Sequence, residues 1–505
     1  MRRLLKILTS RLFIIAPLVV LQFIFFAILL YRLADVARLV PFITLISFLV
    51  VVYVINRDED PAYKIAWCIV ILGFPIVGVP LYILAGNRKV PHQLYDGSIL
   101  AHHQMDDCLK TDPETEEKAL KSDAGRILRY GENNGFPIYE NTESTYYSSG
   151  EEWFPDYIHD LKEARHFIFI EFFIIDKGSL WNEVLEILKE KVKEGVEVTV
   201  IYDDFGSITL PVNYPKELKK YGIEAYRFNH VRPAFIIQMN NRNHRKITVI
   251  DNNVAYTGGV NLADEYANRI TRFGYWKDSA IRIHGKAVWS MTVMFLGMLA
   301  FCRGKDDNLH FHDYELPCDD VSDGGFYQPY CDTPTDNEAV ALNMHLNMVT
   351  HAKKYVYIDT PYLILTETMK QALMRAAKSG VDVRILTPHI PDKKLVFQIT
   401  RGYYRQLIEA GVRIYEFTPG FNHAKNFVSD DRLAIVGSVN TDYRSYFLHF
   451  ENAVLMDRTP SVLQIRDDFL NSLEKSQEIT LEDTKKTFVL IRLVRAVLNI
   501  AIPLL

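Results

Sequence analysis

Apolar residues form long runs near the start of the chain, and further along they alternate with polar residues in short periods. Leu12–Tyr31 is about long enough to cross a bilayer core of roughly 30 Å. Val40–Ile55 is a second, slightly shorter candidate, and the third run, Ala66–Ala85, is interrupted by Gly73, Pro75, Gly78 and Pro80. We therefore expect residues 1–89 to form a membrane anchor. It has two spans and a re-entrant or interfacial third segment, with a plain third span as the alternative.

The basic N-terminus sets the expected orientation of this anchor. Arg2, Arg3, Lys6 and Arg11 precede the first run, and positive charge favours the cytoplasmic side. The run is longer than the apolar part of a signal peptide and no small-residue cleavage site follows it, so we expect it to be retained. Two crossings then return the chain to the cytoplasm at Arg57–Lys64, which places the polar remainder on the cytoplasmic face.

The C-terminal tail, residues 476–505, ends in another segment that could contact a membrane. In Phe488–Leu505, one helical stripe carries Arg492, Arg495 and Asn499, and the other positions are apolar. This pattern predicts an amphipathic helix. Such a helix lies on the bilayer surface or packs on its own domain, and the pattern favours neither.

A polar linker, residues 90–134, precedes the periodic part of the chain. In it we expect one helix over Glu116–Tyr130, preceded by a start signal at Asp112–Thr115. From Phe136 onward strands and helices alternate. We expect a helix from the Ser149 cap to Ala164, then a strand at His166–Ile175, a helix at Leu180–Glu194 and a strand at Val196–Tyr202. This βαβ alternation predicts an α/β fold with mainly parallel mixed sheets flanked by helices.

The second half of the chain repeats the plan of the first. Lys354–Leu363 aligns with the first strand, Thr366–Ser379 with its helix, and Gly411–Phe417 with Gly222–Phe228. We therefore expect two tandem domains, at residues 135–315 and 325–475. The first copy carries an extra stretch, Asn229–Asn243, which we interpret as a loop lining the substrate entry in preference to a mere insertion.

One polar signature also occurs twice. His244–Asp251 reads HRKITVID and His423–Asp430 reads HAKNFVSD, so each is His-x-Lys, four residues and Asp. GGVN (258–261) follows the first copy and GSVN (437–440) the second. A single octet arises by chance in roughly a few per cent of chains of this length. Two copies with matching downstream residues indicate a duplicated domain whose halves build one site.

The residue types of this signature suit an anion. Strand alternation places His244 and Lys246 on one face, and likewise His423 and Lys425. The glycine after each downstream strand frees the backbone to approach a ligand. We expect the two lysines to surround a phosphate, together with Asn261, Asn440, Ser438 and Gly259. One histidine attacks phosphorus and the other protonates the leaving alcohol, since histidines that titrate near 6.5 can be neutral and protonated side by side.

Two kinds of carboxylate accompany the histidines. Asp251 and Asp430 belong to the signature itself, but we expect them at a strand end or turn and away from substrate. Asp278 and Glu451, which lie on the next strand of each half, are expected to orient the histidines by binding the imidazole.

Metal, cofactor and nucleic-acid functions are disfavoured. Each copy offers one His beside a lysine that repels cations, so we expect no metal and no cofactor. The net charge is −5 and the pI about 6.3, which argues against nucleic acid as a partner. The five cysteines have no C-x-x-C spacing and indicate a reducing compartment.

The doubled H-x-K-x4-D followed by G-[GS]-x-N resembles the phospholipase D superfamily. The apolar N-terminal runs, GFPIVGVPLYILAGNRK, NRNHRKITVID and GSVNTDYRSYFLHFEN more narrowly resemble bacterial cardiolipin synthases. Helix 288–301 is more apolar than that family suggests. The resemblance implies two pseudo-twofold-related domains on a bacterial cell membrane. It also implies a phosphatidyltransferase in which His244 is the nucleophile and His423 the acid/base.

The implied substrate and partner is phosphatidylglycerol in the membrane. Transfer of its phosphatidyl group to a second phosphatidylglycerol gives cardiolipin and glycerol. A phospholipase D that uses water and releases phosphatidic acid is the main alternative, and an endonuclease or a catalytically silent membrane scaffold is disfavoured. Another donor, such as phosphatidylethanolamine, stays open, and no motif indicates the oligomeric state.

Overall fold

The computed structural model describes residues 39–57, 59–86, 107–230, 241–304, 309–336 and 338–485, together with Ile24, Met105, Arg495 and Leu498. The chain divides into two compact units. The smaller one contains the apolar N-terminal helices. The larger one, Pro91–His230 with Asn241–Val489, contains both copies of the repeated signature. The first apolar run and the C-terminal helix expected from the sequence lie outside the described residues, apart from three isolated positions.

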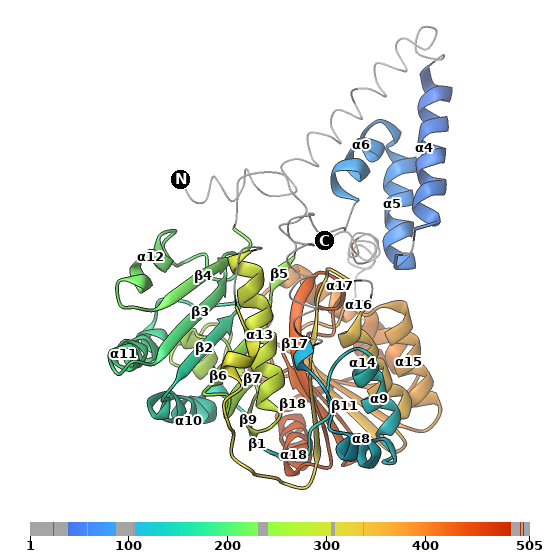
Figure 1. Ribbon diagram of the computed structural model, residues 1–505. Helices are drawn as coiled ribbons and strands as arrows, with labels where there is room; N and C mark the ends of the chain where they lie inside the picture. The colour runs from blue at the N-terminus through green and yellow to red at the C-terminus, as the bar shows by residue number, and fades with distance from the viewer. Residues whose placement is uncertain are drawn as a thin grey trace. The chain divides into compact units, whose positions relative to one another are not determined.

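Among its described residues, the smaller unit has three short helices (Figure 1): α4 (Leu39–Ile55), α5 (Pro61–Gly73) and α6 (Pro75–Ala85). Asp60 caps α5 by accepting a hydrogen bond from Ala62 N at 2.8 Å. The third apolar run is broken at Phe74, and Pro75 starts the next helix, because proline fits the first turn of a helix better than its interior. Within the described part of the chain, no helix reaches the length and apolar character needed to cross a membrane.

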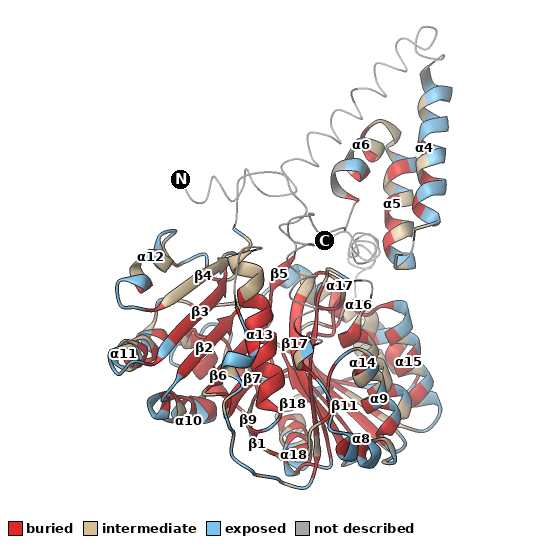
Figure 2. Ribbon diagram, viewed as in Figure 1, coloured by how far each residue is buried: buried red, intermediate tan, exposed pale blue. Residues whose placement is uncertain are grey.

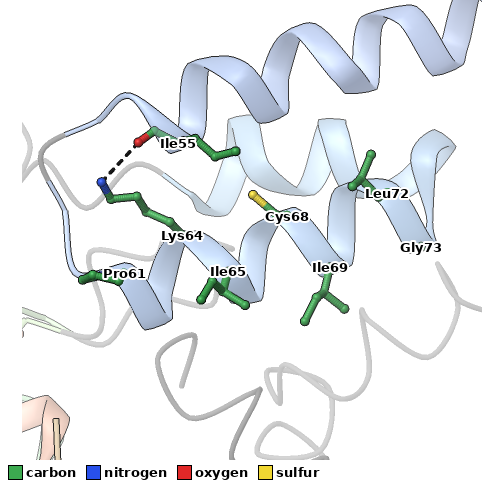
Figure 3. Close-up of a pocket in the computed structure, with 8 residues that line it drawn as sticks. All are labelled: Ile55, Pro61, Lys64, Ile65, Cys68, Ile69, Leu72 and Gly73. Atoms are coloured by element: carbon green, nitrogen blue, oxygen red, sulfur yellow. Dashed lines mark hydrogen bonds between the residues drawn. The ribbon is translucent and has the colours of Figure 1, made fainter. Parts of the chain in front are cut away.

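An apolar groove of about 780 Å³ lies along α5 in this unit. Figure 3 shows its lining by Ile65, Ile69 and Leu72, with Cys68 between them and Lys64 near one end. Lys64 Nζ donates a hydrogen bond to Ile55 O at 3.2 Å, which joins α5 to the end of α4. The groove is therefore built from side chains of the helical unit, and the repeated signature contributes nothing to it.

The first half of the larger unit forms a seven-stranded sheet with the order β1-β9-β7-β6-β2-β3-β4. Its strands are β1 (Thr142–Tyr147), β2 (Phe167–Phe172), β3 (Glu197–Asp203), β4 (Glu224–Phe228), β6 (Lys246–Ile250), β7 (Val254–Gly258) and β9 (Ala280–Gly285). The first four strands along the chain, β1 to β4, are connected by helices α10 (Gly150–Glu163), α11 (Ser179–Lys193) and α12 (Tyr214–Lys219). Ser149 caps α10 as expected, accepting a hydrogen bond from Glu152 N.

The second half repeats this order and adds one strand. The sheet runs β10-β17-β16-β15-β11-β12-β13-β18. Its strands are β10 (Phe326–Asp332), β11 (Tyr355–Asp359), β12 (Asp382–Pro388), β13 (Arg413–Phe417), β15 (Asn426–Ser429), β16 (Leu433–Gly437), β17 (His449–Asp457) and β18 (Ser476–Ile479). Its helices are α14 (Val340–His351), α15 (Glu367–Lys378), α16 (Lys394–Glu409), α17 (Tyr443–Phe447), α18 (Pro460–Glu474) and α19 (Leu481–Lys485). The α/β fold and its duplication are as the sequence predicts.

Both sheets are mixed, as expected, but the expectation that they are mainly parallel is wrong. Along the order of each sheet, only β2–β3 and β3–β4 are parallel in the first, and β11–β12 and β12–β13 in the second. Parallel pairing requires a crossover connection, and α11, α12, α15 and α16 supply it between these strands. The signature lies on hairpins instead, β6–β7 and β15–β16, whose short turns force antiparallel pairing.

The linker contains two helices where we expected one. α8 (Pro113–Leu120) is capped by Asp112, and α9 (Gly125–Asn133) follows after a short turn. A Cβ on Gly125 would meet Leu120 O at 2.2 Å, so the chain turns tightly here in a way that only glycine permits. Ala119, Ile127 and Leu128 are fully buried and join the main core.

Helix α13 (Val288–Arg303) explains the unusually apolar segment noted in the sequence. It contacts β2 and β6 of the first sheet and β10 of the second. Its residues from Val288 to Leu299 are all buried, as the colouring of Figure 2 shows. Phe295 stacks on Phe169 of β2 with 4.5 Å between ring centroids. The helix is apolar on all faces because it fills the core between the two halves.

Two short strand pairs also join the halves. β5 (Arg242–Asn243) of the first half pairs with the start of β17, and β14 (Gly420–Asn422) of the second half pairs with β8 (Tyr275–Lys277). Each of β5 and β14 comes directly before a signature histidine. The duplication therefore places the start of each signature against the opposite half.

Candidate active site

The backbone of each signature histidine is held by the other half. His244 N donates a hydrogen bond to Phe450 O at 2.9 Å, and His423 N donates to Lys277 O at 2.7 Å. Phe450 and Lys277 come directly before the carboxylates Glu451 and Asp278. In each case, a pair of short strands that joins the two halves therefore positions the histidine and its acid together.

The side chains pair across the halves in the same way. Nδ1 of His244 lies 2.9 Å from a Glu451 carboxylate oxygen, and Nδ1 of His423 lies 2.7 Å from Asp278 Oδ2. Both carboxylates are fully buried and each imidazole is 6% exposed. A carboxylate that accepts the Nδ1 proton leaves the lone pair on Nε2. Both rings thus present a basic nitrogen on the side away from the acid.

The signature lysines are buried beside the histidines. Lys246 Nζ donates a hydrogen bond to His244 O at 2.6 Å, and Lys425 Nζ donates to His423 O. Burial lowers the pKa of Lys246 to about 7 and that of Lys425 to about 8. Burying two positive charges away from water costs free energy unless an anion binds beside them. The two lysines are therefore suited to bind a phosphate.

Both signature histidines have a pKa below the ordinary value. Burial, reinforced by Lys246 and Lys425, lowers the pKa of His244 well below its ordinary value, and burial lowers the pKa of His423 to about 4. These lowered pKa values disfavour the expectation that one neutral and one protonated histidine coexist near neutrality. It took the ordinary pKa of an exposed histidine, whereas these rings are desolvated.

The signature aspartates lie in turns and hold backbone. Asp251 accepts hydrogen bonds from the N–H groups of Arg165, His166 and Phe167 at 2.7–2.8 Å. Asp430 accepts from those of Lys353, Lys354 and Tyr355 at 2.7–2.9 Å. Both have a left-handed backbone, with φ of 53° and 57°. Each fastens the β6–β7 or β15–β16 turn to the start of the central strand.

Ser438 and Gly259 contact the carboxylates, which differs from the phosphate contact we expected. The Ser438 hydroxyl donates to Glu451 Oε2 and accepts from Asn452 N at 3.0 Å. At the equivalent position, a Cβ on Gly259 would lie 2.0 Å from Asp278 Oδ1. Glu451 is thus held by a hydroxyl, whereas Asp278 occupies the space that a side chain on Gly259 would fill.

Gly258 and Gly437 also serve packing within the sheet. A Cβ would lie 2.4 Å from Ser279 O at Gly258, and 2.4 Å from the Ala453 Cβ at Gly437. Both contacts are to the neighbouring strand. The absence of a side chain at these glycines therefore permits close packing of neighbouring strands.

Asn261 and Asn440 are buried next to this site with incomplete hydrogen bonding. Asn261 Oδ1 accepts a hydrogen bond from Ile174 N at 3.0 Å, but its Nδ2 has no acceptor among the described residues. The Tyr266 hydroxyl interacts with this amide outside hydrogen-bonding geometry. The Asn440 amide oxygen also lacks a partner there. Buried amides that are left incomplete in this way are suited to a ligand.

A second layer of asparagines and acids was not recognised in the sequence. Asn243 Nδ2 donates to Glu171 Oε1 at 2.7 Å, and Asn422 Nδ2 donates to Asp359 Oδ1 at 3.0 Å. Burial raises the pKa of Glu171 to about 7 and that of Asp359 to about 6. The alignment of the two halves already placed these pairs at equivalent positions, and an acid inside a buried strand was the available signal.

Rings surround the two histidines unequally. Tyr266 and Trp276 each lie 5.3 Å from His423, measured between ring centroids. Phe173 lies 4.9 Å and His449 5.5 Å from His244. The sequence analysis did not identify His449 or these aromatic residues. His449 precedes Glu451 by two positions, as Trp276 precedes Asp278, so the two are equivalent and chemically different.

His449 also adds a possible metal ligand that the signature lacks. One donor atom from each of His244, His449 and Glu451 lies within 4.8 Å of the others. The argument against a metal in the sequence analysis assumed one histidine per copy, whereas His449 places a second histidine beside His244. Most of the stretch expected to line the substrate entry, residues 231–240, lies outside the described residues.

Comparisons with known proteins agree with the duplicated architecture. A family described as cardiolipin synthase, PLD-like domain, matches residues 157–271 and again 346–473. A family described as phospholipase D-nuclease N-terminal matches residues 40–87. Both copies of the signature therefore fall within the matched segments, as does Glu451, whereas Asp278 lies just outside them.

Individual relatives match over most of the chain. An uncharacterized protein of Streptococcus mutans is 41% identical, covering 90% of this chain and 99% of its own length. A cardiolipin synthase of Halalkalibacterium halodurans is 33% identical, covering 92% of each. The crystal structure of phosphatidylserine synthase from Haemophilus influenzae is similar with a TM-score of 0.57 and 15% identity, covering 75% of this chain and 99% of that one. At that identity the likeness concerns the fold alone.

Proposed function

The chain belongs to the cardiolipin synthase family of phospholipase D-like proteins, and we propose that it joins two phosphatidylglycerol molecules through a phospho-histidine intermediate. The observation that carries the proposal is the crossed pairing of His244 with Glu451 and of His423 with Asp278. Each pair leaves a basic Nε2, and the two lysines supply positive charge beside them. A nucleophile, an acid/base and an anion site are the parts that phosphoryl transfer needs.

In the first step, Nε2 of His244 attacks the phosphorus of a phosphatidylglycerol. The P–N bond forms, the bond from phosphorus to the glycerol oxygen breaks, and His423 gives that oxygen a proton. His423 takes up this proton from solvent when the phosphate anion binds beside it, because the anion favours the protonated form of the imidazole. Lys246 and Lys425, with Asn261 and Asn440, stabilise charge on the phosphate oxygens.

In the second step, the free glycerol hydroxyl of another phosphatidylglycerol replaces the departed glycerol. His423 takes its proton, the oxygen attacks phosphorus, and the P–N bond to His244 breaks. Cardiolipin and one glycerol result from two phosphatidylglycerol molecules, and both histidines return to their initial state. No metal or cofactor enters either step. Glu451 and Asp278 keep the proton on Nδ1 throughout, and Ser438 positions Glu451.

We further propose that residues 1–89 attach the enzyme to the bacterial cell membrane with the catalytic unit on the cytoplasmic face. Helix α4 is apolar around its whole circumference, and large side chains such as Phe42, Leu45 and Phe48 are more than half exposed. An exposed apolar surface of this kind needs lipid or protein cover. The proposed orientation rests on the two spans expected from the sequence and on the basic N-terminus.

A product assay tests the function. The full chain is purified in liposomes with phosphatidylglycerol labelled in its headgroup, without added metal, and compared with His244→Ala and His423→Ala. We expect cardiolipin and free glycerol from the wild type and neither from the two variants. Phosphatidic acid and glycerol without cardiolipin would make water the acceptor and the enzyme a phospholipase D. No turnover with any phospholipid supplied would contradict the enzymatic proposal.

A further inference from the structure

His449 is the principal chemical difference between the two otherwise equivalent halves. In one half, Trp276 Nε1 donates to Asp278 Oδ2 at 3.3 Å. In the other, the equivalent ring is an imidazole whose Nδ1 lies 3.5 Å from Glu451 Oε1. Indole is only a donor, whereas neutral imidazole carries a free lone pair. The half with His449 can therefore bind a cation where the half with Trp276 cannot.

The hydrogen bonding of His449 leaves it available. Neither ring nitrogen has a hydrogen-bond partner within the described structure, although both atoms are buried. The side chain is 11% exposed. Buried polar atoms are nearly always satisfied, so an imidazole with two unsatisfied nitrogens calls for a ligand.

The neighbouring groups complete a ligand set. Glu451 lies between the two imidazoles, 2.9 Å from His244 Nδ1 and 3.5 Å from His449 Nδ1. Ligands of a tetrahedral zinc ion at 2.0–2.1 Å are spaced about 3.4 Å apart. All three donor atoms lie within 4.8 Å of one another, so modest ring rotations bring them to that spacing. Two imidazoles and a carboxylate suit zinc better than magnesium or calcium.

We propose that His244, His449 and Glu451 form a reversible inhibitory site for Zn²⁺ or a similar borderline-soft divalent cation. The inhibition follows from the single proton of a neutral imidazole. When Nδ1 of His244 binds the ion, the proton moves to Nε2. Nε2 then has no lone pair for attack on phosphorus. The inhibitory effect rests on the proposed function, but the binding of the ion does not.

The neighbouring lysines limit the affinity. Lys246 and Lys425 repel a further cation beside them. The site is accordingly weaker than a structural zinc site and is emptied by a chelator. This is the behaviour of a reversible inhibitor.

Binding is tested first, independently of turnover, with Co²⁺ as the probe. The full chain in detergent is titrated with Co²⁺ and its visible absorption recorded, for the wild type, His449→Asn and His449→Gln. We expect bands typical of tetrahedral nitrogen and oxygen ligands in the wild type, displaced by Zn²⁺. Loss of one ligand should weaken binding by roughly 10–100-fold or more in both variants. The matched control is His284→Asn, which removes a histidine that also lies between two carboxylates, Glu143 and Asp319, and it should bind as the wild type does.

Inhibition is then measured against each protein's own metal-free rate. Zn²⁺ should inhibit the wild type and His284→Asn, Mg²⁺ should not, and a chelator should restore activity. His449→Asn should need at least about tenfold more Zn²⁺. The site would be overturned if the wild type showed no Co²⁺ bands. It would also be overturned if both His449 variants bound Co²⁺ as tightly as the wild type. Co²⁺ binding without any phospholipid turnover would retain the site and reject the proposed function.

Discussion

Glu451, from the second half of the chain, lies 2.9 Å from Nδ1 of His244, from the first. The mirror pair, Asp278 and His423, is 2.7 Å apart. Neither half therefore contains a complete histidine–acid pair of its own. This relationship explains why the duplicated signature must be present twice in one folded unit.

Replacing the paired acids should reduce catalysis without unfolding the protein. Glu451→Gln and Asp278→Asn keep the volume but can donate to Nδ1, which favours the tautomer with the proton on Nε2. We expect kcat to fall by about 10²–10⁴-fold in each variant, measured as cardiolipin formation at saturating lipid. A similar melting temperature to wild type is the control. Near-normal kcat in either variant would mean that the acid does not set the tautomer.

The signature aspartates should behave differently from these acids. Asp251→Ala and Asp430→Ala each remove the acceptor of three backbone N–H groups, which should destabilise the larger unit by about 1–3 kcal/mol. The asparagine variants keep one oxygen and tolerate the left-handed backbone, so they should lose less. Thermal unfolding measures the difference. Loss of kcat in an asparagine variant of unchanged stability would assign the aspartate a catalytic role instead.

The equivalent positions Gly259 and Ser438 should respond unequally to exchange. Gly259→Ser adds a side chain where Cβ alone lies 2.0 Å from Asp278 Oδ1, so it should displace the acid and lower kcat about as much as Asp278→Asn. Ser438→Gly removes one hydrogen bond to Glu451, and we expect a smaller loss, roughly tenfold or less. The measurement is kcat of the two variants, compared under the same conditions. An equal effect of both substitutions would contradict the packing argument.

Glu171 should make stability depend on pH. Burial raises its pKa from 4.5 to about 7, so its contribution is complete below the unfolded pKa of about 4.3 and is lost as pH rises through about 7. The loss amounts to about 3 kcal/mol. Glu171→Gln keeps an acceptor for Asn243 and cannot ionise, so its melting temperature should fall less between pH 5 and 8. Glu186→Gln, at a 70% exposed side chain, is the control and should follow the wild type; a Glu171→Gln curve parallel to wild type would refute the shift.

The sequence predicted the fold class, the repeat and the elements that follow simple periodicity. α11 and α15 begin and end within a residue of expectation, because both have an amphipathic stripe and a glycine beyond the last turn. Strand direction was wrong because periodicity carries no information on pairing. The periodicity identified the βαβ segments correctly. We then assumed parallel pairing for the remaining strands as well, but these strands form hairpins and pair antiparallel.

The candidate site shows the same division. The residues of the signature and the orienting acids could be named from two aligned copies, but which acid serves which histidine is a tertiary property. The pKa of His423 depends on burial, which the sequence could not supply. His449 had no counterpart of its own type in the first half, so comparison of the copies gave no reason to select it.

The stereochemical course at phosphorus tests the central claim most directly. Phosphatidylglycerol made chiral at phosphorus with sulfur and an oxygen isotope is converted to cardiolipin by the wild type, and the configuration of the transferred phosphorus is determined. Attack by His244 and then by the acceptor hydroxyl comprises two in-line displacements, each with inversion. We therefore predict net retention. Net inversion would mean that the acceptor displaces glycerol in a single step, and the phospho-histidine intermediate would have to be abandoned.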